Sequence, residues 1–187
     1  MLLDALQDFE WENDPAEVTF GEAGMRIKSL PKTDFWQSYR QDFHQDNGHF
    51  FFKKISGNFT ITVCWRFMDI SGFCQCGLMG RINQFNWFKA SVMSDGPGSP
   101  FIGSSLTNFG TSDLASERLP TGTEEIWYRL QSKNNSLVLS YSLDGKEFYQ
   151  IRLFEFSEDY KELQIGAYIC CPSDKNFSAL LDSIEII

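Results

Sequence analysis

Three side chains that could bind a ligand lie close together in the middle of the chain. Arg81, Trp87 and Lys89 occupy positions that alternate with apolar residues in two short runs, 77–82 and 86–92. A tryptophan ring with cationic and amide donors around it can hold a sugar by stacking and hydrogen bonding. The pattern predicts a site for a carbohydrate or sugar-derived small molecule, bound without being transformed.

The same residues also admit a purely structural interpretation. Pairing the two runs as a hairpin with Ile82 opposite Phe88 keeps both apolar sets on the core and places Arg81 directly across from Lys89. Like charges in that arrangement destabilise a sheet, so we expect an acidic group beside them, from the protein or from a ligand. In the alternative, Trp87 covers a second, minor core and both cations are solvated.

Further polar and aromatic residues are expected at the rim of the site, namely Trp36, Asp46, His49 and Gln75. The two histidines, His44 and His49, flank the turn that contains Asp46. Their spacing matches no strong metal-ligand motif. A His49 side chain hydrogen-bonded within a turn is therefore favoured over a metal site, and we expect neither a metal nor a cofactor.

Signatures of catalysis are sparse in the chain. There is no Gly-x-Ser-x-Gly motif and no glycine-rich phosphate loop. Glycoside hydrolysis needs two carboxyl groups about 5–10 Å apart, and no run places alternate acids on one strand face. A carbohydrate-active enzyme, with His49 or a carboxylate pair from distant segments as acid and base, is the first alternative. An interaction or regulatory module of sugar metabolism is the second.

The segments that carry these residues have the alternating pattern of β-strands. Residues 59–67 alternate strictly between apolar and polar side chains, which places Phe59, Ile61, Val63 and Trp65 on one face. Further alternating runs cover residues 25–28, 126–130, 137–141, 148–153, 163–169 and 177–187. Asp144-Gly145, Asn134-Asn135 and Asp46-Asn47-Gly48 supply tight turns. The sequence therefore predicts an all-β, antiparallel β-sandwich with little helix, as a single domain over residues 1–187.

Composition narrows the choice of partners. The net charge of −9 disfavours nucleic acid and anionic membrane surfaces, because both require a cationic footprint. The 18 Phe, 6 Tyr and 5 Trp favour strands packed sheet on sheet. The composition is compatible with an oligomer and does not set its order.

The N-terminal ten residues lack the basic and apolar regions of a signal peptide, and no apolar run reaches the ~20 residues of a membrane helix. We therefore expect a cytoplasmic protein. The five cysteines fit that compartment as reduced, metal-free thiols. A four-thiolate site from Cys74, Cys76, Cys170 and Cys171 requires that two distant segments be neighbours.

Motifs in a fixed order along nearly the whole chain resemble the DUF1349 family. They are Trp11-Glu12-Asn13-Asp14-Pro15, Thr33-Asp34-Phe35-Trp36, Asp46-Asn47-Gly48-His49-Phe50, Gly57-Asn58-Phe59-Thr60, Gly77-Leu78-Met79, Asn86-Trp87-Phe88-Lys89-Ala90, Tyr141-Ser142-Leu143-Asp144-Gly145, Gly166-Ala167-Tyr168 and Cys171-Pro172. The resemblance implies a concanavalin A-like lectin/glucanase fold, a jelly roll. The family includes yeast proteins described as regulators of enolase, and its function is essentially undefined.

The chain departs from the family pattern at two places. Phe73-Cys74-Gln75-Cys76 stands where the family favours Tyr-Asp-Gln-Ala, which removes an acid. Ser112-Asp113-Leu114-Ala115-Ser116 stands where the family has Ser-Asp-Trp-Ser, which removes an aromatic ring. If these positions belong to a site, its version in this chain is altered.

Overall fold

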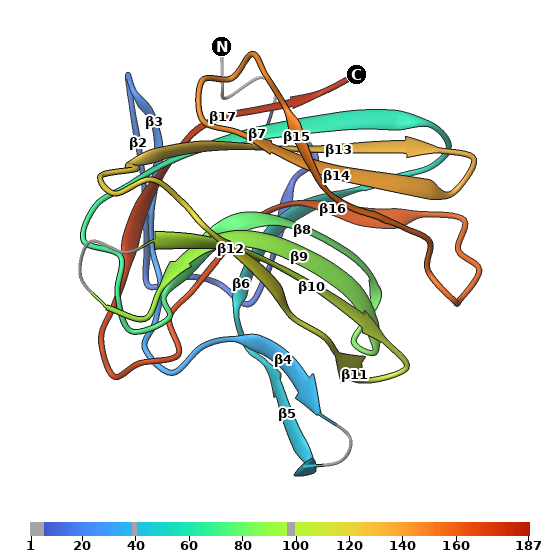
Figure 1. The fold of residues 1–187 in the computed structure, drawn as a ribbon, viewed down its shortest axis with the longest axis horizontal. Helices are drawn as coiled ribbons and strands as arrows, with labels where there is room; N and C mark the ends of the chain where they lie inside the picture. The colour runs from blue at the N-terminus through green and yellow to red at the C-terminus, as the bar shows by residue number, and fades with distance from the viewer. Residues whose placement is uncertain (1–5, 39–40, 97–99) are drawn as a thin grey trace.

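The computed structural model describes residues 6–38, 41–96 and 100–187, and within them it contains strands and no α-helix. The strands form two antiparallel sheets packed face to face (Figure 1), so the predicted all-β sandwich is confirmed. Residues 1–5, part of the N-terminal segment used for the compartment prediction, lie outside the described residues. None of the described segments forms a helix long and apolar enough to cross a membrane.

The larger sheet has ten strands and carries the candidate site. In spatial order it consists of β1 (Glu10–Glu12), β6 (His49–Ile55), β16 (Leu163–Cys170), β8 (Gln75–Asn83), β9 (Asn86–Ser94), β10 (Pro100–Asn108), β11 (Thr111–Ser112), β4 (Phe35–Ser38) and β5 (Phe43–Asp46), with β12 (Ala115–Arg118) also paired to β10.

The smaller sheet has seven strands. In spatial order it consists of β15 (Tyr149–Phe154), β14 (Ser136–Ser142), β13 (Glu125–Lys133), β7 (Phe59–Phe67), β17 (Ser178–Ile186), β3 (Gly24–Lys28) and β2 (Glu17–Gly21).

The main core lies between the two sheets. β7 spans the nine residues whose alternation predicted a strand, and its inward side chains Phe59, Ile61, Val63 and Trp65 are at most 7% exposed. Leu78, Phe88 and Ala90 meet them from the larger sheet. The predicted burial of the β7 side chains is confirmed, because a period of two places every second residue on one face.

Two of the expected turns join paired strands. Asn134 and Asn135 both have positive φ, 52° and 64°, and connect β13 to β14. Gly145 has φ 72° between β14 and β15. The third turn, around Asn47 and Gly48, is different: it connects β5 to β6, and these two strands pair with other neighbours.

The ten-stranded sheet curls so that its far edge folds back over its own hollow side. Figure 1 shows the β4–β5 hairpin beneath the curved strands β8, β9 and β10, on the side away from the smaller sheet. Gly48 permits this approach, since a Cβ there would lie 2.5 Å from the Phe35 ring. The hairpin covers part of the hollow side and leaves part of it open.

The register of the β8–β9 hairpin differs from the predicted one by two residues. Phe88 lies opposite Gly80 rather than Ile82, and Arg81 lies opposite Trp87 rather than Lys89. The connection is shorter than expected because Asn83 pairs with Asn86, and a bulge follows Arg81. The Asn83 side chain accepts a bond from the Phe85 amide and closes the turn. The assignment of faces holds: Phe88 faces the main core and Trp87 does not.

The expectation of five reduced cysteines is wrong for one pair, because Cys74 and Cys171 form a disulfide. The two segments are neighbours: β8 and β16 pair with Cys170 opposite Gln75, which brings Cys171 to Cys74 at the same sheet end. Cys64, Cys76 and Cys170 are free and buried. The disulfide also removes the thiol argument for a reducing compartment.

The disulfide predicts a thiol count. Denatured without reductant, the purified protein should react with a thiol reagent at three cysteines, the free ones, and at all five after reduction.

Replacing both bonded cysteines by serine should lower the free energy of unfolding by about 2–4 kcal/mol, because the bond closes a long loop. Five reactive thiols before reduction would contradict the assignment.

Candidate functional site

The β4–β5 hairpin packs on the hollow side through a second apolar cluster, which we call the hairpin core. It consists of Phe35, Phe50, Phe52, Met79, Trp87, Tyr168 and Cys170. Phe35 comes from the hairpin, and its ring lies 6.4 Å from the rings of both Trp87 and Tyr168. Trp87 is fully buried in this cluster. It therefore forms the minor core that was the structural alternative for this residue.

Arg81 lies beneath the hairpin and is paired with an acid. Its Nη1 and Nη2 atoms donate to the two carboxylate oxygens of Asp46 at 2.5 and 2.8 Å, and Glu12 lies 3.7 Å from Nη2. The Arg81 side chain is 7% exposed. The acid expected beside the two cations thus belongs to the protein, and a fork-to-carboxylate pair of this kind fixes β5 on the sheet.

Lys89 has its own acidic partner. Its Nζ atom lies 2.8 Å from Oδ1 of Asp34, and it also lies 5.8 Å from the ring centres of Trp87 and Tyr168. The Lys89 side chain is 3% exposed and that of Asp34 is 15% exposed. Neither cation is solvated, so this part of the structural alternative is wrong.

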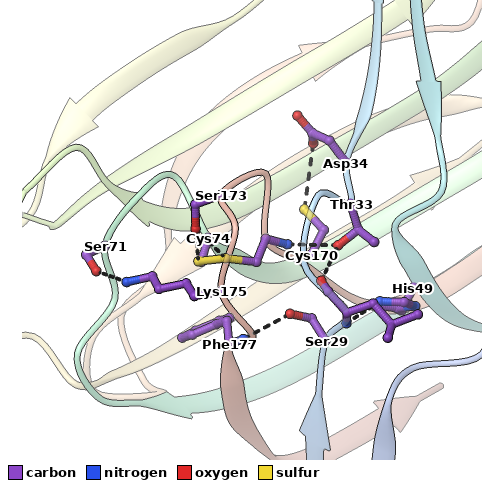
Figure 2. Close-up of a disulfide and its surroundings, with 12 residues drawn as sticks. Ser29, Thr33, Asp34, His49, Ser71, Cys74, Cys170, Ser173, Lys175 and Phe177 are labelled. Carbon is purple, nitrogen blue, oxygen red and sulfur yellow. Dashed lines mark hydrogen bonds between the residues drawn. A yellow bond between two sulfur atoms is a disulfide. The ribbon is translucent and has the colours of Figure 1, made fainter.

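Asp34 is held in place from two directions. Asn47 accepts a bond from the Asp34 amide, and the Asp34 carbonyl accepts bonds from Asn47 and Gly48. On the other side, the preceding residue Thr33 exchanges two bonds with Cys171. Figure 2 shows the Cys170 thiol directed at the Asp34 carboxylate, with Sγ and Oδ1 3.6 Å apart. Burial, together with the charge of Asp34, raises the pKa of the Cys170 thiol well above its usual range.

His49 is a structural residue of the turn region. It is 1% exposed, its Nε2 accepts a bond from the Leu30 amide, and its Nδ1 lies 2.9 Å from the Asn13 carbonyl. Both ring nitrogens are therefore used, and Figure 2 shows the ring bonded to the segment that follows Ser29. The arrangement requires a neutral imidazole protonated at Nδ1. The preference for a hydrogen-bonded histidine agrees with this geometry.

A pocket of about 280 Å³ remains open on the hollow side, and we call it the Trp36 pocket. It is lined by Asp34, Trp36, Phe73, Gln75, Lys89, Met93, Ser105, Leu114 and Pro172. The apolar side chains form most of its wall. Among the polar ones, Lys89 and Ser105 lie directly opposite each other on β9 and β10, Gln75 begins β8, and Asp34 precedes β4.

The structure brings together three of the seven predicted site residues. Trp36, Gln75 and Lys89 line the Trp36 pocket. The remaining four, Arg81, Trp87, Asp46 and His49, do not line it. Trp87 packs against Phe35 beneath the hairpin, Arg81 is bound to Asp46 of the hairpin, and His49 bonds instead to Leu30 and Asn13.

Two polar groups of the pocket have unused hydrogen-bonding capacity. Oε1 of Gln75 lies 3.0 Å from the Tyr168 hydroxyl and 3.4 Å from the Ser91 hydroxyl, which leaves the amide NH₂ available to the pocket. The Ser105 hydroxyl is buried and has no partner among the described residues. Buried polar groups are nearly always satisfied, so a lone hydroxyl at a pocket wall indicates a place for a ligand or a water.

Sequence reasoning missed Asp34, Phe73, Met93, Ser105, Leu114 and Pro172. Two of them carried a signal: Phe73 and Leu114 lie at the positions where the chain departs from the family pattern, and both line the pocket. Phe73 is 50% exposed and Leu114 is 51% exposed. Ser105 carried no signal, since its role depends on strand pairing.

A larger hollow of about 470 Å³ lies elsewhere, over β3, β7 and β17 of the smaller sheet. Arg66 of its lining is already paired with acids, contacting Glu125 at 2.6 Å and Asp182 at 3.2 Å. The hollow holds none of the predicted site residues. Size alone therefore does not make it the candidate site.

The fold and the pocket define a jelly-roll sandwich with a small cleft on its hollow face. The chain belongs to the family described as protein of unknown function (DUF1349), whose profile matches residues 11–187. It is 32% identical over 164 residues to "Regulation of enolase protein 1" of Saccharomyces cerevisiae, covering 87% of this chain and 80% of that one. The crystal structure of a functionally unknown protein from Saccharomyces cerevisiae matches with a TM-score of 0.88 and 26% identity, over 97% of each chain.

More distant structures share the fold. The GH43 protein BlXynB mutant (K247S) from Bacillus licheniformis matches with a TM-score of 0.75 and 14% identity, over 96% of this chain and 36% of that one. The carbohydrate binding module CBM66 from Bacillus subtilis matches with a TM-score of 0.58 and 13% identity, over 94% of each chain. Identities at this level show a common architecture.

The hairpin core predicts the effect of truncating Trp87. Trp87→Ala should reduce the free energy of unfolding by about 3–5 kcal/mol, because the side chain is fully buried and a cavity remains. In a chain of this size that corresponds to a fall in Tm of roughly 10 °C. Thermal unfolding checks this, with the exposed Phe20→Ala as the control; equal Tm values for the two variants would contradict the burial of Trp87.

Burial of His49 predicts a pH dependence of stability. Burial lowers the pKa of His49 below 6.5, although the carbonyls of Asn13 and Asp14 and the charge of Asp14 oppose this. At His49 the unfolded chain then binds a proton more readily than the folded one. The contribution of neutral His49 to the free energy of unfolding is therefore complete above pH 6.5, and it is lost as the pH falls through the pKa of His49 in the folded protein.

Urea unfolding at about pH 7.5 and about pH 5.5 measures this loss. Wild-type stability should fall more over this interval than that of His49→Gln, which lacks the titrating ring. An equal fall in both proteins, or a pKa at or above 6.5 for the His49 ring in an NMR titration, would contradict the account.

Proposed function

We propose that this protein binds a carbohydrate in the Trp36 pocket and does not transform it. The observation that carries the proposal is the unpartnered, buried Ser105 hydroxyl in a pocket whose wall is largely apolar and aromatic. A sugar offers the matching surface, with C–H groups on its ring faces and hydroxyls on its edge. The fold likeness to a carbohydrate binding module is consistent with such a site and adds no residue-level support.

The wall of the pocket suits the face of a sugar ring. Trp36 is partly exposed and Phe73 is 50% exposed, so both aromatic surfaces are in contact with water in the ligand-free protein. Covering them removes apolar area from water at about 25 cal/mol per Å². This contact supplies affinity that depends little on which sugar is bound.

The floor of the pocket suits sugar hydroxyls. The Gln75 amide NH₂ and the Ser105 hydroxyl can donate, and the outward carboxylate oxygen of Asp34 can accept. Hydrogen bonds of this kind contribute about 0.5–1.5 kcal/mol each, and more when one partner is charged. They supply selectivity for hydroxyl positions.

The size and the acid content of the pocket limit what it can do. A volume of about 280 Å³ is at the lower end for small-molecule sites and suits one sugar ring rather than a chain. Asp34 is the one carboxylate in the described lining, and its Oδ1 already bonds to Lys89. Glycoside hydrolysis uses two carboxyl groups, so binding is the activity that these residues support. The name of the yeast relative refers to regulation of enolase, and it describes the yeast protein.

Thermal shift against neutral monosaccharides tests the proposal, with glucose, galactose, mannose, xylose and arabinose as probes. At a concentration about tenfold above its Kd, a bound sugar stabilises the native state by about 1.4 kcal/mol and raises Tm by roughly 3–5 °C. Ser105→Ala should leave the ligand-free Tm almost unchanged, because its hydroxyl has no protein partner, and should weaken binding severalfold.

Ser104→Ala is the matched control, since Ser104 is the preceding residue on β10 and its hydroxyl instead faces Arg152. Trp36→Ala should abolish the shift. If no sugar raises Tm, or if Ser105→Ala and Ser104→Ala bind a sugar equally well, the proposal is wrong.

A further inference from the structure

The charges in the Trp36 pocket are already balanced within the protein. Lys89 is the cation of the lining and Asp34 is its anion, and they bond to each other at 2.8 Å. Arg81, which is buried further along the hollow side, is bound to Asp46 and does not line the pocket. A ligand entering the pocket therefore meets an ion pair with no net charge.

The two oxygens of the Asp34 carboxylate have different surroundings. Oδ1 accepts from Lys89 Nζ, the Phe35 amide and the Cys170 thiol. Oδ2 has no hydrogen bond among the described residues, although the side chain lines the pocket. It is the oxygen that can accept a ligand hydroxyl.

From this arrangement we infer that the ligand is a neutral sugar or polyol, and that acidic sugars are rejected. The inference rests on the proposed function and names its ligand class. An O–H group can donate to Asp34 Oδ2 while a neighbouring oxygen accepts from Ser105 or Gln75, which is the pattern of two adjacent hydroxyls. A phosphate or carboxylate offers no proton to Asp34 and is repelled by it, and Lys89 has already been paired.

Asp34→Asn tests the inference by removing the charge while keeping the shape. The amide oxygen of the substituted side chain can still accept from Phe35 and Lys89, but Lys89 then places an uncompensated positive charge in the pocket. The probes are glucose, galactose and mannose, each compared by calorimetric titration with its uronic acid and its 6-phosphate. For the sugar that binds best, wild type should prefer the neutral form by about tenfold or more, and Asp34→Asn should shift this ratio toward the acids by about tenfold or more.

Two controls separate charge from structure. The double variant Asp34→Asn with Lys89→Met has no net charge in the pocket, so it should again bind the neutral sugar more tightly than its acids. We expect it to fold, because replacing a buried ion pair by residues of similar volume is often tolerated. Asp182→Asn makes the same change in net charge at an ion pair of the smaller sheet and should leave the preference unchanged.

Wild type alone provides a further measurement that needs no variant. The Kd of the neutral sugar should not change with salt concentration, because no net charge is neutralised on binding. Tighter binding of a uronic acid or sugar phosphate by wild type, with a Kd that weakens in salt, would overturn the inference and leave sugar binding standing. If no sugar of either kind binds, the proposed function fails and this inference fails with it.

Discussion

The docking of the β4–β5 hairpin on the hollow side is the constraint on which the rest of the structure depends. Phe35 contributes the apolar contact, and Asp34 and Asp46 contribute acids that reach two cations buried on the sheet. Unpaired, either cation would carry a large desolvation penalty, so the hairpin and the sheet stabilise each other. Gly48 allows the close approach, and the Thr33–Cys171 bonds hold the start of the hairpin.

The hairpin also determines where a ligand can bind. It covers Trp87 and Arg81, which the sequence marks as ligand contacts, and leaves open the end of the sheet that contains Gln75 and Ser105. The disulfide lies at that open end, between residues adjacent to Phe73 and Pro172 of the pocket wall. One half of the hollow side thus serves stability, and the other half keeps exposed aromatic surface and unused hydrogen-bonding groups.

The sequence predicts what depends on local pattern. Alternation along β7 gives both the strand and its buried face, and the paired asparagines give the turn after β13. It does not predict what depends on distant partners. The bond of Lys89 to Asp34 spans 55 positions. Because the sequence does not show that Lys89 already has this partner, it favours Lys89 as a ligand contact. The predicted β8–β9 register is wrong for a local reason. The Asn83–Asn86 pair closes a shorter turn and a bulge follows Arg81, and together they override the pairing that apolar matching favoured. Ser105 becomes notable only when β10 is placed beside β9.

The central claim is that the Trp36 pocket, rather than the larger hollow near Arg66, receives a neutral sugar. An NMR titration of the ¹⁵N-labelled protein with neutral monosaccharides measures this directly. The claim predicts that the Gln75 side-chain amide, the Trp36 indole and the Ser105 backbone amide shift together and reach saturation at one Kd. Signals from Arg66 and Leu180 should stay fixed in the same titration. Saturable shifts at Arg66 and Leu180, with the Gln75 and Trp36 signals unmoved, would contradict it.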